Sequence, residues 1–363
     1  SYTDEVLAEQ GPGGYEELYL LAGEAHYFKQ NYLEAAEHYN VYANSTKRKL
    51  PADAQYKLAY SLYATGQYDL AQEKFKTLAS IDAEVGQFAS YYLGELYIKQ
   101  DNLKYAAASY QKASQDAYNK DIQEASAFKA AKIQYELGNY SQSIEGLQQF
   151  LSSYPESSFN GEAGDLLSEA YLNTSNYQQA IDHLEETGIN STRARRTYQK
   201  VTYYRGTQLF NNSKYYSAVQ MFKKSLAYPE EKEFKLLANY WSGEAYSVGK
   251  KNSEAISAYQ QVLQERDLSS HEKYVRAHYG LGYAYYNTQQ YASALDQFDA
   301  FLNSYSEKNR FYDDAIIRAA DCHYVLKDYQ LAIDKFQQAI QNESHDSDYA
   351  LLQQGTVQSI QGS

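Results

Sequence analysis

The side chains that could perform acid-base, nucleophilic or metal chemistry are few and scattered. The chain of 363 residues contains seven histidines and a single cysteine, Cys322. No two histidines stand four residues apart, the spacing that places two metal ligands on one face of a helix. One cysteine allows neither an intrachain disulfide nor a zinc site built from several thiolates. We therefore expect no metal site and no cofactor.

Catalytic patterns are also missing. The sequence contains none of the GxSxG, HExxH, Walker or dinucleotide-binding glycine motifs, and its carboxylates are too evenly spread to mark an acid and base pair. Cys322 precedes His323, but consecutive residues of a helix point in different directions, so we expect a buried, inert thiol. We expect His26 and His323 to be packing residues. These observations predict a protein that is not an enzyme and has no catalytic residues.

Composition limits the partners. With 46 acidic residues against 33 Lys and Arg, the formal charge is -13, which repels nucleic-acid phosphate and anionic lipid. No apolar run approaches the ~18 residues that span a bilayer, so we expect no direct membrane insertion. The chain starts at Ser1 without a hydrophobic signal segment, and the expectation is a cytoplasmic protein or one whose leader has been removed.

The segments that must position these residues repeat along the chain. Nine times, a small residue is followed nine positions later by a residue that is usually Tyr, then after three by Ala, then after four by a bulky apolar residue. Leu103 and Asn252 are the exceptions at the Tyr position, and Ser143 replaces the Ala once. The small residues, called anchors below, are Gly23, Ala59, Gly94, Ala131, Ser168, Gly206, Gly243, Gly282 and Ala320.

Each unit reads as two helices joined by a polar or glycine-containing turn. The first helix carries the anchor, which allows its neighbour to approach closely, and the second begins near the Tyr. We expect the large side chains of one unit to fill the gap before the next. Anchors are 35 to 39 residues apart, and we expect the residues beyond a minimal unit to lie between units. A single unit cannot bury its apolar face alone, so stability comes from stacking.

The pattern resembles the tetratricopeptide repeat family, as in YGLGYAYYNTQQYASALDQF at 279–298. The resemblance implies an all-α fold: a right-handed superhelical α-solenoid of about nine helix-turn-helix repeats plus a terminal helix. It also implies a non-enzymatic scaffold with a concave groove lined by the first helices. The family's closing Pro appears only at Pro155, with Pro229 one place early. The long connections, as in 150–171, resemble exported bacterial members of the periplasm and outer membrane, which favours a periplasmic or exported location, with the cytoplasm as the alternative.

The expected organisation has three parts. Residues 1–15 form a short helix and a glycine-rich linker, residues 16–346 form the nine repeats, and residues 347–363 form a capping helix or a truncated tenth repeat. Exposed ends of such a stack allow homodimerisation.

Three rows on the first helices face the expected groove. The upper row lies three residues before each anchor, the middle row one residue after it, and the lower row four residues after it, so that together they form one stripe. Tyr rings offer contact area with few rotors, and carboxylates would select Lys or Arg of a ligand. The candidate binding residues are Tyr27, Tyr56, Tyr60, Tyr63, Tyr91, Glu95, Phe128, Lys132, Tyr135, Tyr203, Phe210, Tyr240, Glu244, Tyr279, Tyr283, Tyr286 and Tyr324.

Two functions remain open at this point. The first is a protein-interaction scaffold that holds a partner peptide or helix in the groove, with a role in bacterial envelope assembly. The second is binding of carbohydrate or another envelope polymer on tyrosine platforms. A single Trp among 363 residues counts against the second, because strong sugar platforms favour Trp.

Overall fold

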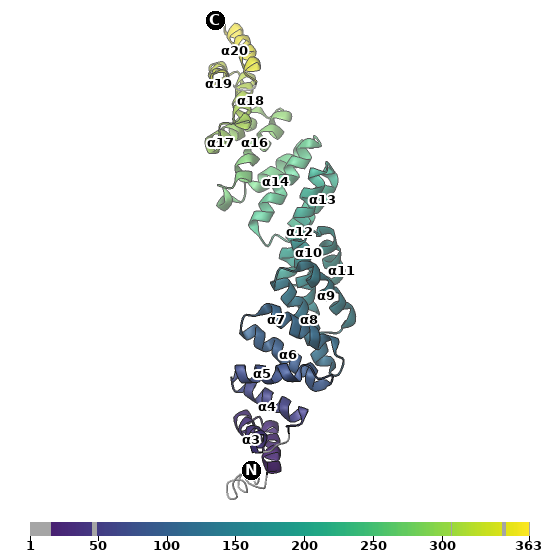
Figure 1. The fold of residues 1–363 in the computed structure, drawn as a ribbon. Helices are drawn as coiled ribbons and strands as arrows, with labels where there is room; N and C mark the ends of the chain where they lie inside the picture. The colour runs from purple at the N-terminus through teal and green to yellow at the C-terminus, as the bar shows by residue number, and fades with distance from the viewer. Residues whose placement is uncertain (1–15, 46–48, 306, 343–345, 363) are drawn as a thin grey trace. The chain divides into compact units, whose positions relative to one another are not determined.

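The computed structural model describes residues 16–45, 49–305, 307–342 and 346–362. Within these ranges the chain forms nineteen α-helices and one short 3-10 helix, without a β-strand (Figure 1). The predicted all-α class is thereby confirmed. The short helix and linker predicted for residues 1–15 lie outside the described residues.

The helices alternate as the repeat predicts, and every second helix begins at the position nine residues after an anchor. The first helices are α2 Glu16–Phe28, α4 Ala52–Ala64, α6 Glu84–Lys99, α8 Lys120–Glu136, α10 Asn160–Asn173, α12 Thr192–Asn211, α14 Lys232–Val248, α16 Glu272–Asn287 and α18 Arg310–Leu326. The second helices are α3 Tyr32–Ser45, α5 Tyr68–Leu78, α7 Leu103–Gln115, α9 Tyr140–Ser153, α11 Tyr177–Thr187, α13 Tyr215–Leu226, α15 Asn252–Val262, α17 Tyr291–Ser304 and α19 Tyr329–Gln341. The 3-10 helix η1 Arg266–Leu268 precedes α16, and α20 Ser347–Gln361 follows α19.

The turn inside each repeat reverses the chain through one left-handed residue. The residue seven positions after each anchor has a positive φ, as at Gly66 (80°), Gly138 (76°) and Asp101 (55°). The following amide donates to the carbonyl three residues after the anchor, as in Asn102 N to Tyr97 O at 2.8 Å. This bond satisfies a carbonyl at the helix end and fixes the hairpin angle.

Anchors are small because a ring lies on them. A Cβ added at Gly94 would meet Tyr110 at 2.6 Å, and one at Gly282 would meet Phe298 at 2.8 Å. The bulky residue therefore packs first on the anchor of its own repeat, and it does not only fill the gap before the next repeat, as we had expected. Tyr259 does both, because its ring also lies 2.4 Å from a Cβ built at Gly280 of the following repeat.

The described chain divides into two compact units, one up to Thr174 and one from Ser175. The boundary falls in the turn of the fifth repeat, and each unit has its own core. Phe75 and Leu58 are fully buried in the first unit, and Phe298, Phe336 and Cys322 in the second. Burial raises the pKa of the Cys322 thiol to about 12, in keeping with the expected inert thiol.

The last helix, α20, packs like a further first helix. Ala350 and Val357 are fully buried, and Tyr349 donates to Asp321 Oδ1 of α18 at 3.0 Å. Leu351, Leu352 and Ile360 face outward and expose 60%, 67% and 52% of their surface.

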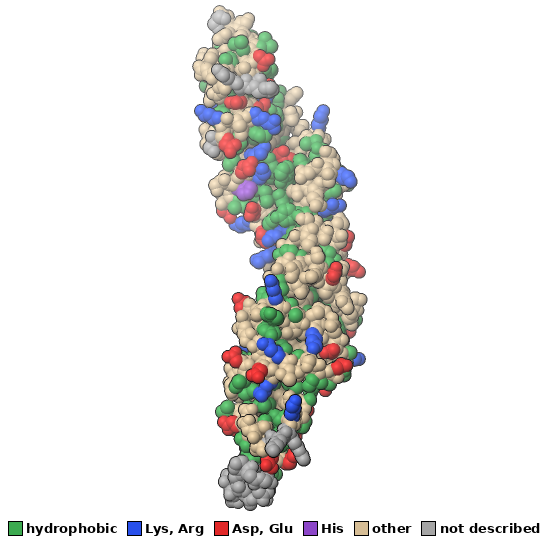
Figure 2. All heavy atoms as spheres, in the orientation of Figure 1, with side chains coloured by type: hydrophobic (Ala, Val, Ile, Leu, Met, Phe, Trp, Pro, Cys, Tyr) green, Lys and Arg blue, Asp and Glu red, His purple; other side chains and the backbone are tan. Residues whose placement is uncertain are grey.

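Within the described residues, no helix has both the length and the apolar character needed to cross a membrane. Acidic and basic side chains are intermixed on the face that Figure 2 shows.

Candidate functional site

The first unit contains a cluster of tyrosine rings that pack on one another. This N-terminal tyrosine cluster consists of Tyr27, Tyr56, Tyr60, Tyr63 and Tyr92. The Tyr60 ring lies 5.1 Å from Tyr92 and 5.8 Å from Tyr27, both edge to face. The Tyr63 ring lies 5.3 Å from Tyr92. The predicted groove residues of α2 and α4 are thus brought together, and Tyr92 of α6 joins them.

Burial governs the chemistry of this cluster. It raises the pKa of Tyr27 to about 12, with the neighbouring Tyr60 as a second cause, and burial also raises the pKa of Tyr56 and Tyr92. The phenols of Tyr27, Tyr56 and Tyr92 therefore stay protonated well above neutral pH. Each offers a neutral hydroxyl at the edge of an apolar ring surface.

The second unit holds two tyrosines in a different way. The Tyr279 and Tyr283 rings of α16 are 5.1 Å apart, and both hydroxyls donate to Asp314 Oδ2 of α18, at 2.8 Å and 2.5 Å. Arg318 Nε lies 3.4 Å from Asp314 Oδ1. This C-terminal tyrosine pair is therefore fixed by a carboxylate of the next repeat.

A hollow of about 630 Å³ opens beside this pair. Tyr279 and Phe311 provide its aromatic wall, and Ile317 provides an aliphatic one. Its charged lining consists of Arg310, Asp313, Asp314 and Asp346. Three carboxylates against one guanidinium make the hollow acidic, and its size is within the range of known ligand sites.

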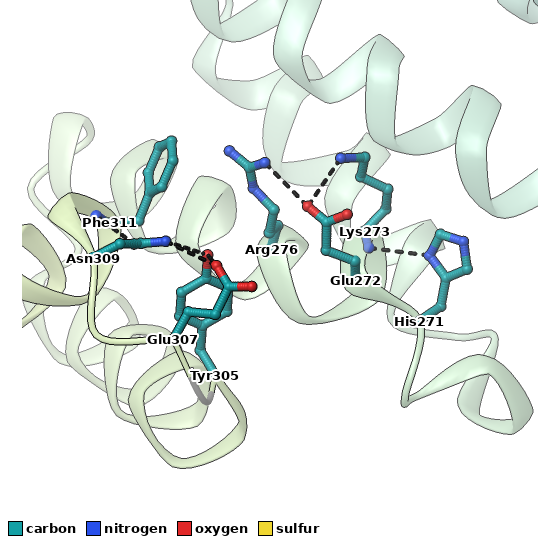
Figure 3. A network of polar contacts seen from close by, with 8 residues as sticks. All are labelled: His271, Glu272, Lys273, Arg276, Tyr305, Glu307, Asn309 and Phe311. Atoms are coloured by element: carbon teal, nitrogen blue, oxygen red, sulfur yellow. Dashed lines mark hydrogen bonds and ion pairs between the residues drawn. The ribbon is translucent and has the colours of Figure 1, made fainter.

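A polar network borders the hollow (Figure 3). Arg276 of α16 lies over the Phe311 ring at 4.4 Å and donates to Glu272 Oε1 at 3.2 Å. Lys273 Nζ lies 3.2 Å from the same Glu272 oxygen. On the other side, Asn309 caps the start of α18, where its Oδ1 accepts the Phe311 backbone N–H at 3.0 Å. Phe311 is thus held in place between a cation and a helix cap.

The carboxylates of the middle row are engaged by the chain itself. Glu24 pairs with Lys57 Nζ at 3.2 Å, and Glu169 accepts from Tyr135 at 2.8 Å. Glu244 accepts the Tyr259 hydroxyl at 2.7 Å.

The other two middle-row carboxylates are paired in the same manner. Glu95 is bound by Lys129 and by the Tyr110 hydroxyl. Asp321 pairs with Arg318 Nη1 at 2.6 Å. We expected this row to select basic groups of a ligand, but its five carboxylates already have partners in their own unit. Asp314 is likewise bound by two phenols and Arg318, but it also lines an open volume together with Asp313 and Asp346.

The remaining predicted residues take part in smaller contacts. The Tyr91 hydroxyl accepts from Lys129 at 3.0 Å, and Lys132 pairs with Glu162 at 2.7 Å. The others each lie beside an aromatic ring at the start of a second helix. The centroid distances are 5.5 Å for Tyr135 and Tyr140, 5.2 Å for Phe210 and Tyr215, 5.5 Å for Tyr286 and Tyr291, and 6.3 Å for Tyr324 and Tyr329.

Three predicted residues are buried. Phe128, Tyr203 and Tyr240 expose only 3%, 8% and 3% of their surface. Phe128 stacks on Phe159 at 4.9 Å, and Tyr203 lies edge-on against Phe234 at 5.2 Å. We assign these three side chains to the packing between first helices and leave them out of the contact surface proposed below.

Sequence reasoning missed two positions that complete the site. One lies two residues before the anchor, where Lys129 and Tyr92 reach back to the preceding repeat and Arg318 pairs with Asp314 and Asp321 of its own helix. The other is Asp314, six residues before its anchor. A signal for the internal pairing was present in two repeats that have Glu after the anchor and Tyr as the bulky residue, namely Glu95 with Tyr110 and Glu244 with Tyr259.

The histidines do not gather around a metal. In the part of the chain that the structure describes, no group of three His, Cys, Asp or Glu side chains could hold a metal ion. His26 instead stacks on His38 at 5.2 Å, and His323 is buried.

Family comparison agrees with this helical architecture. Models of the tetratricopeptide repeat match residues 56–122, 125–157, 243–309 and 314–344, together more than half of the chain. The chain therefore belongs to the tetratricopeptide repeat family, and the repeats described above are an α-solenoid arrangement. Members of this family are generally protein-interaction scaffolds and are typically not enzymes. No curated protein matches the sequence.

Several solved structures are similar at low sequence identity. A chain of the Naa15/Naa10 complex bound to HypK-THB is 14% identical with a TM-score of 0.46 and matches 96% of this chain; this chain spans 61% of its length. The C-terminal part of a repeat-containing protein from Cytophaga hutchinsonii is 18% identical with a TM-score of 0.41, covering 68% of this chain and 94% of that one. The TPR2AB domain of yeast Sti1, in complex with pHSP90, is 17% identical with a TM-score of 0.33. The match covers 88% of this chain and 99% of the Sti1 chain.

Proposed function

We propose that this protein is a scaffold that binds a basic peptide segment of a partner protein at the hollow between α16 and α18. The family supports the scaffold role, and the acidic hollow supports the chemistry of the ligand. A Lys or Arg side chain would enter beside Asp313, Asp314 and Asp346, while an adjacent apolar residue would contact Phe311 and Tyr279.

The hollow beside Tyr279 is the single observation that carries this proposal. Tyr279 was a candidate from its position in the repeat, and the structure adds an open volume and an acidic lining at that position. Asp314 is held by two phenols and a guanidinium, so its carboxylate is oriented before a ligand arrives. Such preorganisation reduces the entropy cost of binding.

The alternative of carbohydrate binding on groove tyrosines has no specific support. The rings of the N-terminal tyrosine cluster lie edge against face and are half-buried, so that they do not present open faces to a sugar.

The setting of this scaffold is part of the proposal. We propose a periplasmic or exported protein that serves bacterial envelope assembly, because its long inter-repeat connections resemble those of exported family members. Cell fractionation tests this location, and recovery in the cytosol alone would contradict it. We further propose that two copies of the chain associate through the exposed face of α20. Sedimentation tests this, because the double variant Leu351→Glu and Leu352→Glu should then remain monomeric under conditions in which the unchanged protein forms a dimer.

Selection from a phage-displayed library of random dodecapeptides tests the ligand chemistry. The expected result is enrichment of peptides in which Lys or Arg stands next to an aromatic or aliphatic residue. Counter-selection with Asp314→Asn should remove them, because the variant keeps the side-chain shape and lowers the negative charge.

A matched control is Asp296→Asn on the exposed surface of α17, which changes the net charge equally but lies away from the hollow lining. It should retain the selected peptides. Selection of acidic peptides, or equal loss with both variants, would contradict the proposal.

A further inference from the structure

A second hollow lies wholly inside the first unit, on another face of the helices. It has a volume of about 690 Å³, and its lining residues belong to α7, α8 and α9 and to Tyr154 directly after α9. Figure 1 labels these three successive helices. On α8 the hollow uses Ala127, Ala130 and Gln134, about a third of a turn away from Phe128, Lys132 and Tyr135 of the predicted groove. It is therefore a separate site from the groove.

The repeats show why this place is hollow. Three residues after the anchor, the fifth and eighth repeats have Tyr171 and Tyr285, and each hydroxyl accepts from a Gln of the preceding second helix. Gln148 Nε2 lies 2.7 Å from the Tyr171 hydroxyl, and Gln260 Nε2 lies 2.9 Å from that of Tyr285. In the fourth repeat this position is Gln134. The ring is absent, and the Gln134 amide oxygen accepts from Asn139 at 2.9 Å.

The equivalent place in the second unit supports the view that the size of these side chains determines the volume of the hollow. Between α15, α16 and α17, the hollow shrinks to about 430 Å³. Leu281 stands there where the first unit has Ala130, and Tyr285 stands where it has Gln134. Smaller side chains at two matched positions thus leave the larger volume in the first unit.

Amides dominate the lining. The hollow is bordered by Gln111, Gln115, Gln123, Gln134, Gln142 and Gln149. Glu145 is its one charged residue, and no Lys, Arg or His contributes. Each glutamine can both donate and accept hydrogen bonds. Tyr154 is half-buried at the border of the hollow, and its ring is tilted by 36° against the fully buried Phe150 at a centroid distance of 5.3 Å. The lining provides no cationic side chain to pair with an anion.

We propose that this amide-lined hollow is a binding site for a short neutral oligosaccharide. A sugar hydroxyl has one donor hydrogen and two acceptor lone pairs, and a glutamine amide offers both acceptors and donors, so a wall of amides can satisfy both roles of each hydroxyl. A peptide is the weaker candidate, because peptide recognition needs pockets for alternate side chains or a groove for a helix, and this hollow is a single amide-lined cavity. The site goes beyond the scaffold function and does not depend on it.

Calorimetric titration of the full chain with maltotriose, cellotriose and chitotriose tests the site. Binding of at least one of them with a Kd below about 10 mM is expected, as for weak, wet sugar sites. Gln134→Tyr restores the ring found at Tyr171 and Tyr285, so it fills the hollow with a side chain that the fold already accepts. It should weaken binding by about tenfold or more.

A second variant tests the same site in case Gln134→Tyr disturbs the fold. Gln115→Leu removes one amide without changing the volume much and should weaken binding by about fivefold. Its matched control is Gln264→Leu, at the same position of the seventh repeat beside the smaller hollow, which should change Kd by less than about twofold.

The proposal is overturned by any of three results. These are no heat of binding with all three sugars, unchanged binding in both Gln134→Tyr and Gln115→Leu, or displacement of the sugar by a neutral Gly-Ser hexapeptide at equal concentration.

Discussion

Tyr56 and Tyr60 of the N-terminal tyrosine cluster occupy the same positions of the repeat as Tyr279 and Tyr283 of the C-terminal tyrosine pair, but the two regions are held by different forces. Around Tyr60, rings pack on rings, and no hydroxyl of the cluster donates to a carboxylate in the described chain. At Tyr279 and Tyr283, both hydroxyls converge on Asp314, and a hollow opens beside them. Identical side chains at identical positions thus form core in one place and a polar site in the other.

What differs is the neighbouring first helix. Tyr92 of α6 inserts a ring among the tyrosines of α4, with its plane 15° from that of Phe75 at 5.6 Å. In the second unit, α18 offers Asp314 and Phe311 to the tyrosines of α16. The side chains of the following first helix therefore determine whether the space beside a pair of tyrosines is filled by another ring or remains a hollow.

The largest effect is expected from removing a ring of the N-terminal tyrosine cluster. Tyr60→Ala should lower the free energy of unfolding by about 3 kcal/mol, because the Tyr60 ring contacts rings on both sides. Tyr60→Phe should cost less than about 0.5 kcal/mol. Urea unfolding followed by circular dichroism measures the free energy of unfolding of both variants. If Tyr60→Phe lost as much stability as Tyr60→Ala, the hydroxyl and not the ring packing would account for the stabilisation.

Removing hydroxyls should instead matter in the C-terminal tyrosine pair. The double variant Tyr279→Phe and Tyr283→Phe should cost about 2 kcal/mol, since the Asp314 carboxylate loses two donors. The same urea experiment measures it. A cost no greater than that of Tyr60→Phe would remove the distinction between the two regions.

A smaller effect is expected in strong alkali. The pKa of Tyr279 is raised, mainly because the side chain is buried and further because Tyr283 and Asp314 lie close to it. Burial also raises the pKa of Tyr27 to about 12. A phenol whose pKa is higher in the folded protein contributes stability that is complete below pH 10 and is lost as pH rises through the folded pKa. Stability should therefore be level from pH 7 to 9 and fall above pH 10.

Absorbance at 295 nm, which reports tyrosinate, separates the two regions. Asp314→Asn should allow the C-terminal tyrosine pair to ionise at lower pH, because it removes the neighbouring negative charge. An unchanged titration would show that the carboxylate does not act on these phenols.

Much of the fold could be predicted from the sequence. The start of each second helix follows from the spacing, since Tyr32, Tyr140 and Tyr291 each begin one. The spacing predicts these helix starts because the small anchor and the residue nine positions later belong to the same helical hairpin, whose packing sets the distance between them. The left-handed residue seven after the anchor was harder to predict, since only two of the nine are glycine and the others are polar residues such as Asp101 and Lys327.

The site was less predictable, for a physical reason. Tyr279 and Tyr283 were found by their position, but Asp314 became visible only when α18 was placed against α16. A hollow is an absence of side chains, and it depends on volumes contributed by several helices at once. The smaller residues Ala130 and Gln134, which stand where the eighth repeat has Leu281 and Tyr285 and which leave room for the amide-lined hollow, are not marked by any periodic pattern.

The binding of a basic segment at Asp314 is the central claim, and a calorimetric comparison tests it most directly. A library-selected peptide and its copy with Lys replaced by norleucine would be titrated into the protein at 50 mM and 200 mM salt. The account predicts that the replacement weakens binding by about tenfold or more, that Asp314→Asn produces a similar loss, and that higher salt weakens only the Lys peptide. Equal affinity of the two peptides for the protein would contradict it.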